Sequence, residues 1–299
     1  MTANLPRYDK AFDPGPVELH ARDVHFDVSD APLEWIPGHP VPSHVISTLN
    51  LFLPEGERWF VRTFNEALPL VRDEQLASAM RGFVGQEAVH ADTHDKALRD
   101  YLVRGGIDPD PAERQMAWIF RRLLEPRETD SPRKAHKNLT ERLWLIAAIE
   151  HYTAVLGDFA LNSGWARGGA HPGMTDMFQW HGAEEVEHRS VAHEVATYFD
   201  NSYLSRIRAM VISILGLFLI ISRTTRYLLK ADPERNYPFP QVIVGWLRGV
   251  RAGHVPSLWS VILTTVPYFS TKYDPADVGS TAQAVAYLAA SPGARGGAQ

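Results

Sequence analysis

The sequence predicts an all-α fold, and three observations support this prediction. Long segments repeat apolar residues every three to four positions, which is the spacing of one face of an α-helix. Glycines and prolines separate these segments, and no segment of any length alternates apolar and polar residues as a half-buried strand does. With 299 residues and 45% hydrophobic content, the chain is long enough to bury a substantial core.

The composition excludes several classes of protein and of site. A net charge of -5 gives no basic footprint for nucleic acid. Cysteine is absent, so disulfides, thiolate metal sites and cysteine nucleophiles are all excluded. Any metal would be held by histidine and carboxylates, a donor set that favours iron, manganese or zinc. The first fifteen residues contain no apolar run and so no secretory signal, and we expect a cytoplasmic protein.

The first part of the chain is expected to lead into a helix that carries one inward carboxylate. Residues 1–42 are rich in Pro, Asp and His without helical periodicity, so they form an irregular arm, either packed on the body or partly disordered. A first helix from Ser43 is expected to be interrupted near Pro54 and to restart there. Glu57 shares a face with apolar residues of the restarted helix; the alternative is a surface glutamate in a first turn.

Two long helices follow, each with polar residues on its apolar stripe. The first is expected from about residue 73 to 104, before Gly105-Gly106. Its inward stripe is Met80, Phe83, Glu87, His90, His94, Ala97 and Tyr101. A shorter helix is expected from Asp110 to about Glu125. The second long helix runs from Ser131 to about Asn162, and its stripe carries Glu150 between alanines, which leaves room beside the carboxylate.

The next helix, expected to end near Asp200, carries three polar residues on its inward face. His181, Glu185 and His188 stand at i, i+4 and i+7, so their side chains point the same way. The same face continues through small and apolar residues as far as Phe199. Unpaired buried polar groups cost several kcal/mol, so a helix with this stripe must satisfy these groups or use them. Two imidazoles and a carboxylate at one place suit a metal ion.

An uncharged segment, residues 209–222, lies beyond the polar stripes, flanked by arginines within residues 206–226. At 1.5 Å per residue it spans only about 21 Å, short of the roughly 30 Å of a bilayer core. This length favours a buried helix; contact with a membrane surface and a true span are the alternatives. One or two short helices should follow within residues 238–268. We expect residues 43–290 to form one helical metal-binding domain and residues 291–299 a flexible tail.

The four inward carboxylates and two of the histidines repeat in a simple order along the chain. This order is Glu57, Glu87-x-x-His90, Glu150 and Glu185-x-x-His188. It is the order expected of two helix hairpins that face each other, as in dinuclear carboxylate bundles. Four carboxylates and two imidazoles suffice for two adjacent divalent ions. A purely structural role would bury four carboxylates with few inward Lys or Arg to pair them, which is expensive.

The motifs around these residues resemble a known family over roughly residues 50–200. They are Pro54-Glu55-Gly56-Glu57, Gln86-Glu87-x-x-His90-x-x-x-His94, Glu150-x-x-Thr153-Ala154 and Trp180-His181-x-x-Glu184-Glu185-x-Glu187-His188. The chain resembles ferritin-like proteins described as predicted metal-dependent hydrolases, which implies a ferritin-like four-helix bundle with additional C-terminal helices. His181 is similar to the extra histidine of p-aminobenzoate N-oxygenase-type di-iron enzymes. The resemblance implies seven metal ligands, with one iron richer in nitrogen: Glu57, Glu87, His90, Glu150, His181, Glu185 and His188.

Further residues are expected around the ligands. Gln86 and Glu184 each precede a ligand glutamate, where ferritin-like oxygenases often keep a residue bonded to the opposite histidine. Asp158 is another such candidate, though a capping or surface role fits it equally. His94 would support a ligand, contact substrate, bind metal or be a satisfied core histidine. Thr153 would place a hydroxyl near the oxygen-binding face or bond its own helix backbone. Thr153 and His94 are therefore the candidate catalytic residues.

The sequence therefore predicts a di-iron carboxylate oxygenase or oxidase that binds two Fe ions, with Mn or Zn as alternatives. Its partners would be O2, a small apolar organic substrate and an external electron donor, with a homodimer left open. The main alternative is a dinuclear metal-dependent hydrolase, although hydrolytic dinuclear sites are more often built from loops at strand ends. A metal-storage or other non-catalytic bundle is a third class, for which the sequence offers no support.

Overall fold

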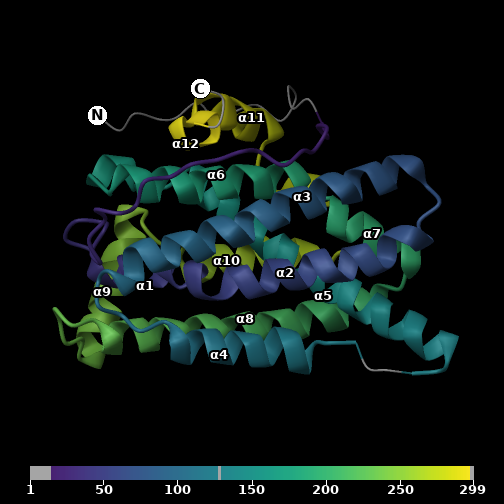
Figure 1. The fold of residues 1–299 in the computed structure, drawn as a ribbon, viewed down its shortest axis with the longest axis horizontal. Helices are drawn as coiled ribbons and strands as arrows, with labels where there is room; N and C mark the ends of the chain where they lie inside the picture. The colour runs from purple at the N-terminus through teal and green to yellow at the C-terminus, as the bar shows by residue number, and fades with distance from the viewer. Residues whose placement is uncertain (1–14, 127–128, 297–299) are drawn as a thin grey trace.

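The computed structural model describes residues 15–126 and 129–296 (Figure 1). Helices dominate these residues and no strand occurs among them, which confirms the predicted all-α fold. Short 3-10 or π segments extend several of the helices. The α-helices are α1 Pro40–Ser47, α2 Leu49–Ala67, α3 Glu74–Ala97, α4 Asp110–Trp118, α5 Pro132–Leu161, α6 Pro172–His188, α7 Val191–Phe199, α8 Tyr203–Ala231, α9 Phe239–Ala252, α10 Leu258–Thr265, α11 Thr281–Ala290 and α12 Pro292–Arg295.

Four helices surround the polar stripes. Helix α2 packs along α3 and α5 along α6, and contacts between α2 and α5 and between α3 and α6 join the two pairs. The stripe predicted on α3 is buried over its whole length, from Met80 to Tyr101. The stripe on α5 is buried as well, from Leu143 to Leu161. Apolar residues form clusters on both sides of the polar layer, so the charged side chains lie inside the bundle.

The first helix break differs from the prediction. Pro54 lies inside α2, and the chain instead breaks at Thr48, between α1 and α2. The Thr48 hydroxyl donates a hydrogen bond to the carbonyl of Val45 at 2.7 Å, which satisfies an acceptor in the last turn of α1. Because α2 is continuous through Pro54, Glu57 lies in mid-helix, and the residue is only 1% exposed.

The helix predicted to end near Asp200 is two helices in the structure. It breaks after His188, and α7 begins at Val191. The Arg189 guanidinium donates hydrogen bonds to the carbonyl of Val186 and to the Thr281 hydroxyl, so it takes an acceptor that a continuing helix would use. The ligand stripe therefore stands at the C-terminal end of α6.

The chain before α1 is an irregular strap that lies along the bundle. Residues 15–39 contain no helix or strand, and Figure 1 shows this part running across α6 towards α1. Phe26 is buried against Trp180, with ring centroids 5.2 Å apart. The expected flexible tail begins with a packed turn, because a Cβ on Gly293 of α12 would lie 2.1 Å from the Phe26 ring. Residues 297–299 of that tail and residues 1–14 of the predicted arm lie outside the described residues.

The uncharged segment 209–222 is the middle of α8, a helix of 29 residues. One side of α8 packs on α5, and its buried residues there include Ala209, Met210 and Ser213. The opposite side is exposed, so the expectation of a buried helix holds for one face only. Among the described residues, α8 is the one helix long and apolar enough to cross a membrane, judged by length and composition, a test that core helices also pass.

Two glycines allow α5 and α6 to touch. A Cβ on Gly157 would lie 2.4 Å from the carbonyl oxygen of Gly182, and a Cβ on Gly182 would lie 2.7 Å from the Cα of Gly157. Both distances are too short for carbon atoms, so neither position accepts a side chain without movement of the backbone. The two helices that carry Glu150 and Glu185 are therefore in direct backbone contact.

We expect Gly157→Ala to lower the free energy of unfolding by about 1–3 kcal/mol, because the added methyl group must push α5 away from α6. Urea unfolding measures this change. The matched control is Gly216→Ala in the middle of α8, where no atom lies within 4 Å of the new Cβ. That variant should gain about 0.5–1 kcal/mol from helix propensity. Equal stability of the two variants would contradict the close contact of α5 and α6.

Candidate metal centre

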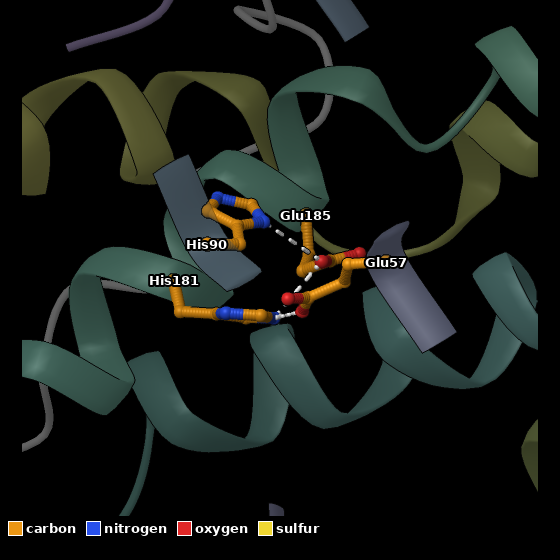
Figure 2. A group of neighbouring side chains, drawn as sticks. All are labelled: Glu57, His90, His181 and Glu185. Carbon is orange, nitrogen blue, oxygen red and sulfur yellow. Dashed lines mark ion pairs between the residues drawn. The ribbon is translucent and has the colours of Figure 1, made fainter. Parts of the chain in front are cut away.

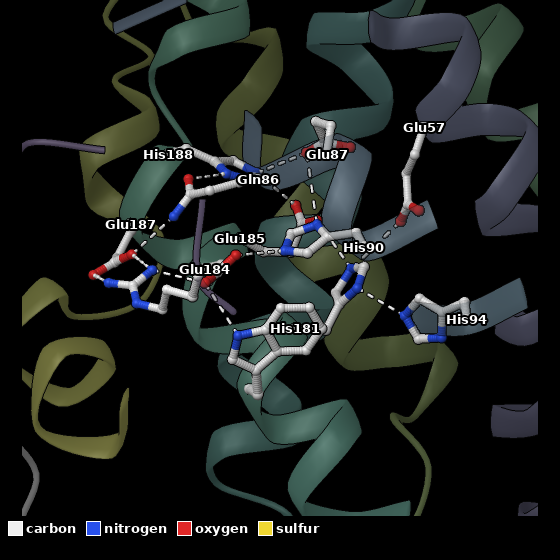
Figure 3. Close-up of polar contacts among 12 residues, drawn as sticks. Glu57, Gln86, Glu87, His90, His94, His181, Glu184, Glu185, Glu187 and His188 are labelled. Atoms are coloured by element: carbon white, nitrogen blue, oxygen red, sulfur yellow. Dashed lines mark hydrogen bonds and ion pairs between the residues drawn. The ribbon is translucent and has the colours of Figure 1, made fainter. Parts of the chain in front are cut away.

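The structure brings the seven predicted ligands to one place inside the bundle, and Figure 3 labels all of them except Glu150. Four helices supply them, and all seven side chains are buried. The residues are Glu57 from α2, Glu87 and His90 from α3, Glu150 from α5, and His181, Glu185 and His188 from α6. Helix geometry explains the convergence, because residues three or four apart on one helix share a face.

These residues form two groups that share one member. In the first group, one potential ligand atom each from Glu57, His90, His181 and Glu185 lies within 4.8 Å of the others (Figure 2). In the second group, the same holds for Glu87, Glu150, Glu185 and His188. Glu185 belongs to both groups, so its carboxylate can reach two cation positions. The first group holds two imidazoles and the second holds one, so the two positions differ in nitrogen content.

Several atoms of these residues are buried without a hydrogen-bond partner. They are both carboxylate oxygens of Glu57, both of Glu87, Oε2 of Glu150 and Nδ1 of His90. A buried polar atom without a partner costs free energy, and a buried carboxylate without a cation costs more. Divalent cations would satisfy all of these atoms at once, and carboxylate with imidazole is a donor set for iron, manganese or zinc. The side chains therefore fit a centre of two divalent metal ions.

The histidine of each Glu-x-x-His motif forms a hydrogen bond with a residue of the opposite helix pair, through the ring nitrogen that faces away from the candidate ligand carboxylates. Nε2 of His90 lies 2.8 Å from Oε2 of Glu184, and Nδ1 of His188 lies 3.1 Å from Oε1 of Gln86. Since each acceptor is an oxygen, that ring nitrogen carries a proton, and the other nitrogen faces the carboxylates, where it can bind a cation once it is deprotonated. The supporting bonds predicted for Gln86 and Glu184 are thus present. Asp158 instead accepts a hydrogen bond from the Asn162 amide, near the end of α5.

His181 is oriented by a chain of two hydrogen bonds. Nδ1 of His94 lies 2.8 Å from Oδ1 of Asn50, and Nε2 of His94 lies 2.8 Å from Nδ1 of His181. His94 donates to the amide oxygen and accepts from Nδ1 of His181, so Nε2 of His181 is the ring nitrogen that faces the carboxylates. This Nε2 lies 2.9 Å from Oε1 of Glu185, so it either donates a proton to that oxygen or shares a cation with it. Both ring nitrogens of His94 are used in this chain, which is the geometry of a supporting residue rather than a ligand.

Burial and neighbouring charges shift the pKa values of the ionisable residues in the centre. Burial raises the pKa of Glu57 and Glu87 well above the usual value, and neighbouring carboxylates raise it further. The same causes raise the pKa of Glu150 to about 7. Burial lowers the pKa of His188, but Glu185 and Glu150 outweigh this and raise it to about 10. Burial would raise the pKa of Glu185, but His188 and His181 hold it well below the usual value. The carboxyl groups with raised pKa values in the metal-free centre therefore retain protons that bound cations would displace.

The strap before α1 adds a residue that the sequence did not predict. The Arg22 guanidinium lies 2.7 Å from Glu184 and 2.8 Å from Glu187, and Glu187 also accepts from the Gln86 amide at 3.1 Å. Arg22 thus neutralises the outer layer of acidic residues behind His90 and His188. No periodicity marks Arg22, but Glu184 and Glu187, one turn apart on a buried helix, required a cationic partner that the four helices lack.

We expect Arg22→Met to lower the free energy of unfolding by about 3 kcal/mol, because it leaves two buried carboxylates without their cation. The Arg22 side chain is 17% exposed, which places the effect at the low end for a broken buried pair. Urea unfolding of the metal-free protein measures it. Arg208→Met is the control, since Arg208 pairs with Glu141 at the surface. A loss no larger than that of the control would show that Arg22 is dispensable.

A cavity reaches the centre from the side of α8. Its apolar lining includes Phe52, Leu53, Phe60, Phe120, Ile149 and Leu217. Its polar lining consists of Glu57, Glu185 and Thr153. The Thr153 hydroxyl lies 3.1 Å from the Glu150 carbonyl and 3.3 Å from Oε1 of Glu150, so it touches both its own helix backbone and a candidate ligand. The cavity therefore gives the candidate metal positions an apolar surrounding on the side of α8.

Comparisons with curated proteins and with solved structures find no match for this chain. A family model described as "Predicted metal-dependent hydrolase" matches residues 20–279. The match covers the part of the strap that carries Arg22, all seven candidate ligands and helices α8 to α10. With most of its length matched and with buried His/Glu groups that could hold metal ions, the chain belongs to the family of predicted metal-dependent hydrolases.

Proposed function

We propose that this protein is a ferritin-like di-iron oxygenase or oxidase that oxidises a small apolar organic molecule. One observation carries the proposal: two groups of buried ligands share Glu185 and lie at the end of an apolar cavity. An all-helical frame with paired Glu-x-x-His turns is typical of dinuclear carboxylate proteins. O2 and an external electron donor would be its co-substrates, and we infer a cytoplasmic location.

The candidate ligands, the residues that line the cavity and Thr153 would have different roles. Glu57, His90 and His181 would hold one ion, Glu87, Glu150 and His188 the other, and Glu185 both. Two ferrous ions would supply the electrons that reduce O2. Phe52, Phe60, Phe120 and Leu217 would exclude water and hold the apolar substrate beside the centre. The Thr153 hydroxyl, within reach of Glu150 and of the cavity, would hold a proton at the edge of the reaction space.

A hydrolase is the second candidate, and the description of the family favours it. In that case the ligands would hold zinc or manganese, which would activate water for the hydrolysis of an ester or phosphoester. The lining of the cavity argues against a phosphoester, because no Lys, Arg or amide side chain is among its lining residues. An apolar ester would still fit the lining.

The metal and the co-substrate distinguish these candidates. Protein purified from iron-supplemented cells should contain about two irons per chain. It should consume O2 when a reductant and an apolar substrate are present, and the zinc-loaded or manganese-loaded protein should be inactive. Ester hydrolysis by the zinc or manganese form without O2 would replace the oxygenase proposal with the hydrolase. Iron content near zero would contradict both the di-iron centre and the oxygenase.

We expect His181→Ala to keep most of its iron and to slow O2 consumption by about 10–100-fold, the usual cost of disturbing a ligand environment. Six ligands remain, but the first group loses one of its two imidazoles. Metal analysis and oxygen-electrode rates measure the two effects. His136→Ala, an exposed histidine near the start of α5, is the control and should change neither. Unchanged O2 consumption by the His181 variant would show that His181 is a core histidine and not a ligand.

A further inference from the structure

Helices α8, α9 and α10 expose large apolar side chains in stripes. The stripe on α8 includes Phe218 and Leu219, which are 62% and 65% exposed. The exposed apolar residues are Leu204, Val211, Ile212, Leu215, Phe218 and Leu219 of α8, Phe239, Ile243, Val244 and Leu247 of α9, and Leu258, Trp259, Ile262 and Leu263 of α10. We call these residues the apolar face. On each helix they recur every three to four positions, so each stripe lies along one side of its helix.

The three helices are joined on the bundle. Helices α8 and α9 both pack on α1. The Tyr203 hydroxyl at the start of α8 donates to the carbonyl of Phe269, just after α10, at 2.8 Å. Figure 1 shows α8 on the side of the bundle away from α11 and α12. The stripe on α8 alone, with six large exposed apolar side chains along one side of a helix, exceeds the scattered apolar residues of an ordinary protein surface and marks an interaction site.

The charge of this part of the chain is opposite to that of the rest. Residues 203–273 contain nine Lys and Arg but only two acidic residues, a balance of +7, so the rest of the chain carries -12. One of the two acidic residues, Asp232, is buried and bonded to His44 and Tyr237. On α8 the exposed Arg208, which pairs with Glu141, lies between Leu204 and Val211, and the exposed Arg223, Arg226 and Lys230 follow the stripe. Arg248 and Arg251 follow the stripe of α9.

We propose that the apolar face docks on the surface of an anionic lipid bilayer, with α8 lying in the plane of the interface. Apolar side chains between basic residues are the pattern of interfacial helices, in which the apolar side enters the acyl boundary and the arginines meet lipid phosphates. Helix α8 does not cross the bilayer in this arrangement, because its other side packs along α5, whose first turns carry exposed charges including Lys137.

The same charges disfavour a second copy of the chain as the occupant. A two-fold contact through the apolar face would bring the arginines of one copy towards those of the other. Glu234 is the only exposed acidic residue within 203–273 that could pair with them. Lipid phosphates, in contrast, complement the whole basic rim.

Docking would also place the cavity beside the lipid. Leu217 of α8 lines the cavity, while its neighbour Phe218 belongs to the apolar face. A single helix therefore separates the acyl chains from the apolar approach to Glu57 and Glu185. If the proposed function holds, the substrate is a lipid-soluble molecule taken from the bilayer; this last step rests on the proposed function, whereas docking itself does not.

Co-sedimentation of the full-length, metal-loaded protein with vesicles tests the docking. We expect binding to phosphatidylcholine vesicles with about one-third phosphatidylserine, at least tenfold weaker binding to pure phosphatidylcholine, and weaker binding at high salt. Phe218→Glu with Leu219→Glu should reduce binding to the anionic vesicles by at least tenfold. Leu70→Glu is the matched control, because Leu70 is 55% exposed but lies at the end of α2, outside the apolar face. Arg223→Gln with Arg226→Gln should remove most of the salt dependence.

Three results would overturn the proposal. One is failure of the folded wild-type protein to sediment with anionic vesicles. Another is equal binding by the Phe218/Leu219 variant, once circular dichroism shows that it is folded. The third is a wild-type dimer that this variant converts to a monomer without vesicle binding, which would assign the face to a second copy. Metal content and oxidation of a soluble substrate, measured on the same samples, report on the proposed function separately, so either idea can fail alone.

Discussion

Glu185→Ala is expected to reduce the bound divalent metal from about two ions per chain to near zero. Glu185 is the one residue present in both ligand groups, so its loss leaves each group with three ligands and removes the carboxylate between them. It also removes the partner of His181 at 2.9 Å and of His188 at 3.2 Å. Metal analysis after dialysis measures the stoichiometry, and calorimetric titration measures the affinity.

A graded series makes this prediction specific. Glu57→Ala affects the first group only, so about one ion should remain tightly bound. Glu141→Ala, on the exposed side of α5, should retain the full content. Two tightly bound ions in the Glu185 variant would contradict the shared carboxylate. Loss of both ions in the Glu57 variant would show that the two positions fill only together.

The metal-free protein is expected to lose stability as the pH rises from about 5 to about 8. Burial, and then neighbouring carboxylates, raise the pKa of Glu57, Glu87 and Glu150 in the folded state, the last to about 7. A carboxyl group with a raised folded-state pKa binds more protons when folded than when unfolded. The stabilisation that such a group contributes is therefore fully present below its pKa in the unfolded state, and it is lost as the pH rises through its pKa in the folded state. Glu150 alone would account for about 3 kcal/mol.

The metal-loaded protein should show the opposite trend. Divalent cations bind the deprotonated carboxylates, so metal affinity, and with it stability, increases with pH over the same range. Urea unfolding at several pH values, with and without metal, measures both curves. Glu57→Gln with Glu87→Gln should flatten the metal-free curve, because glutamine has no proton to lose. Stability of the metal-free protein that rises with pH would show that these carboxylates are ionised and paired by other means.

Much of the candidate site could be predicted from the sequence because the helix itself places the residues. His181, Glu185 and His188 lie on one helix, so their spacing alone aligns them, and the same holds for Glu87 and His90. The supporting roles of Gln86 and Glu184 followed from the residue next to each ligand glutamate. Inward stripes then required the four helices to face each other. Helical periodicity, together with the requirement that the polar stripes face each other, was sufficient to predict this part of the site.

Other features depend on contacts between distant parts of the chain and leave no periodic signal. Arg22 lies 162 residues from Glu184 in the sequence, and Asn50 lies 44 residues from His94. The break lies at Thr48, whose hydroxyl bonds to the backbone carbonyl of Val45, whereas Pro54 suggested a different place. The exposed side of α8 could not be predicted for another reason. A helix that is apolar on all sides is expected to be buried, and only the packing shows which side is covered.

The contact between Gly157 and Gly182 fixes how closely α5 and α6 approach each other near the metal centre. Glu150 stands two turns before Gly157, and Glu185 stands three residues after Gly182. Because the backbones touch at this point, α5 and α6 cannot approach each other more closely there. Substitution of these glycines, rather than of the ligands, should therefore change the size of the ion that the centre prefers. Alanine or serine at either position would widen the gap and move selectivity towards larger ions such as Mn2+, with every ligand retained.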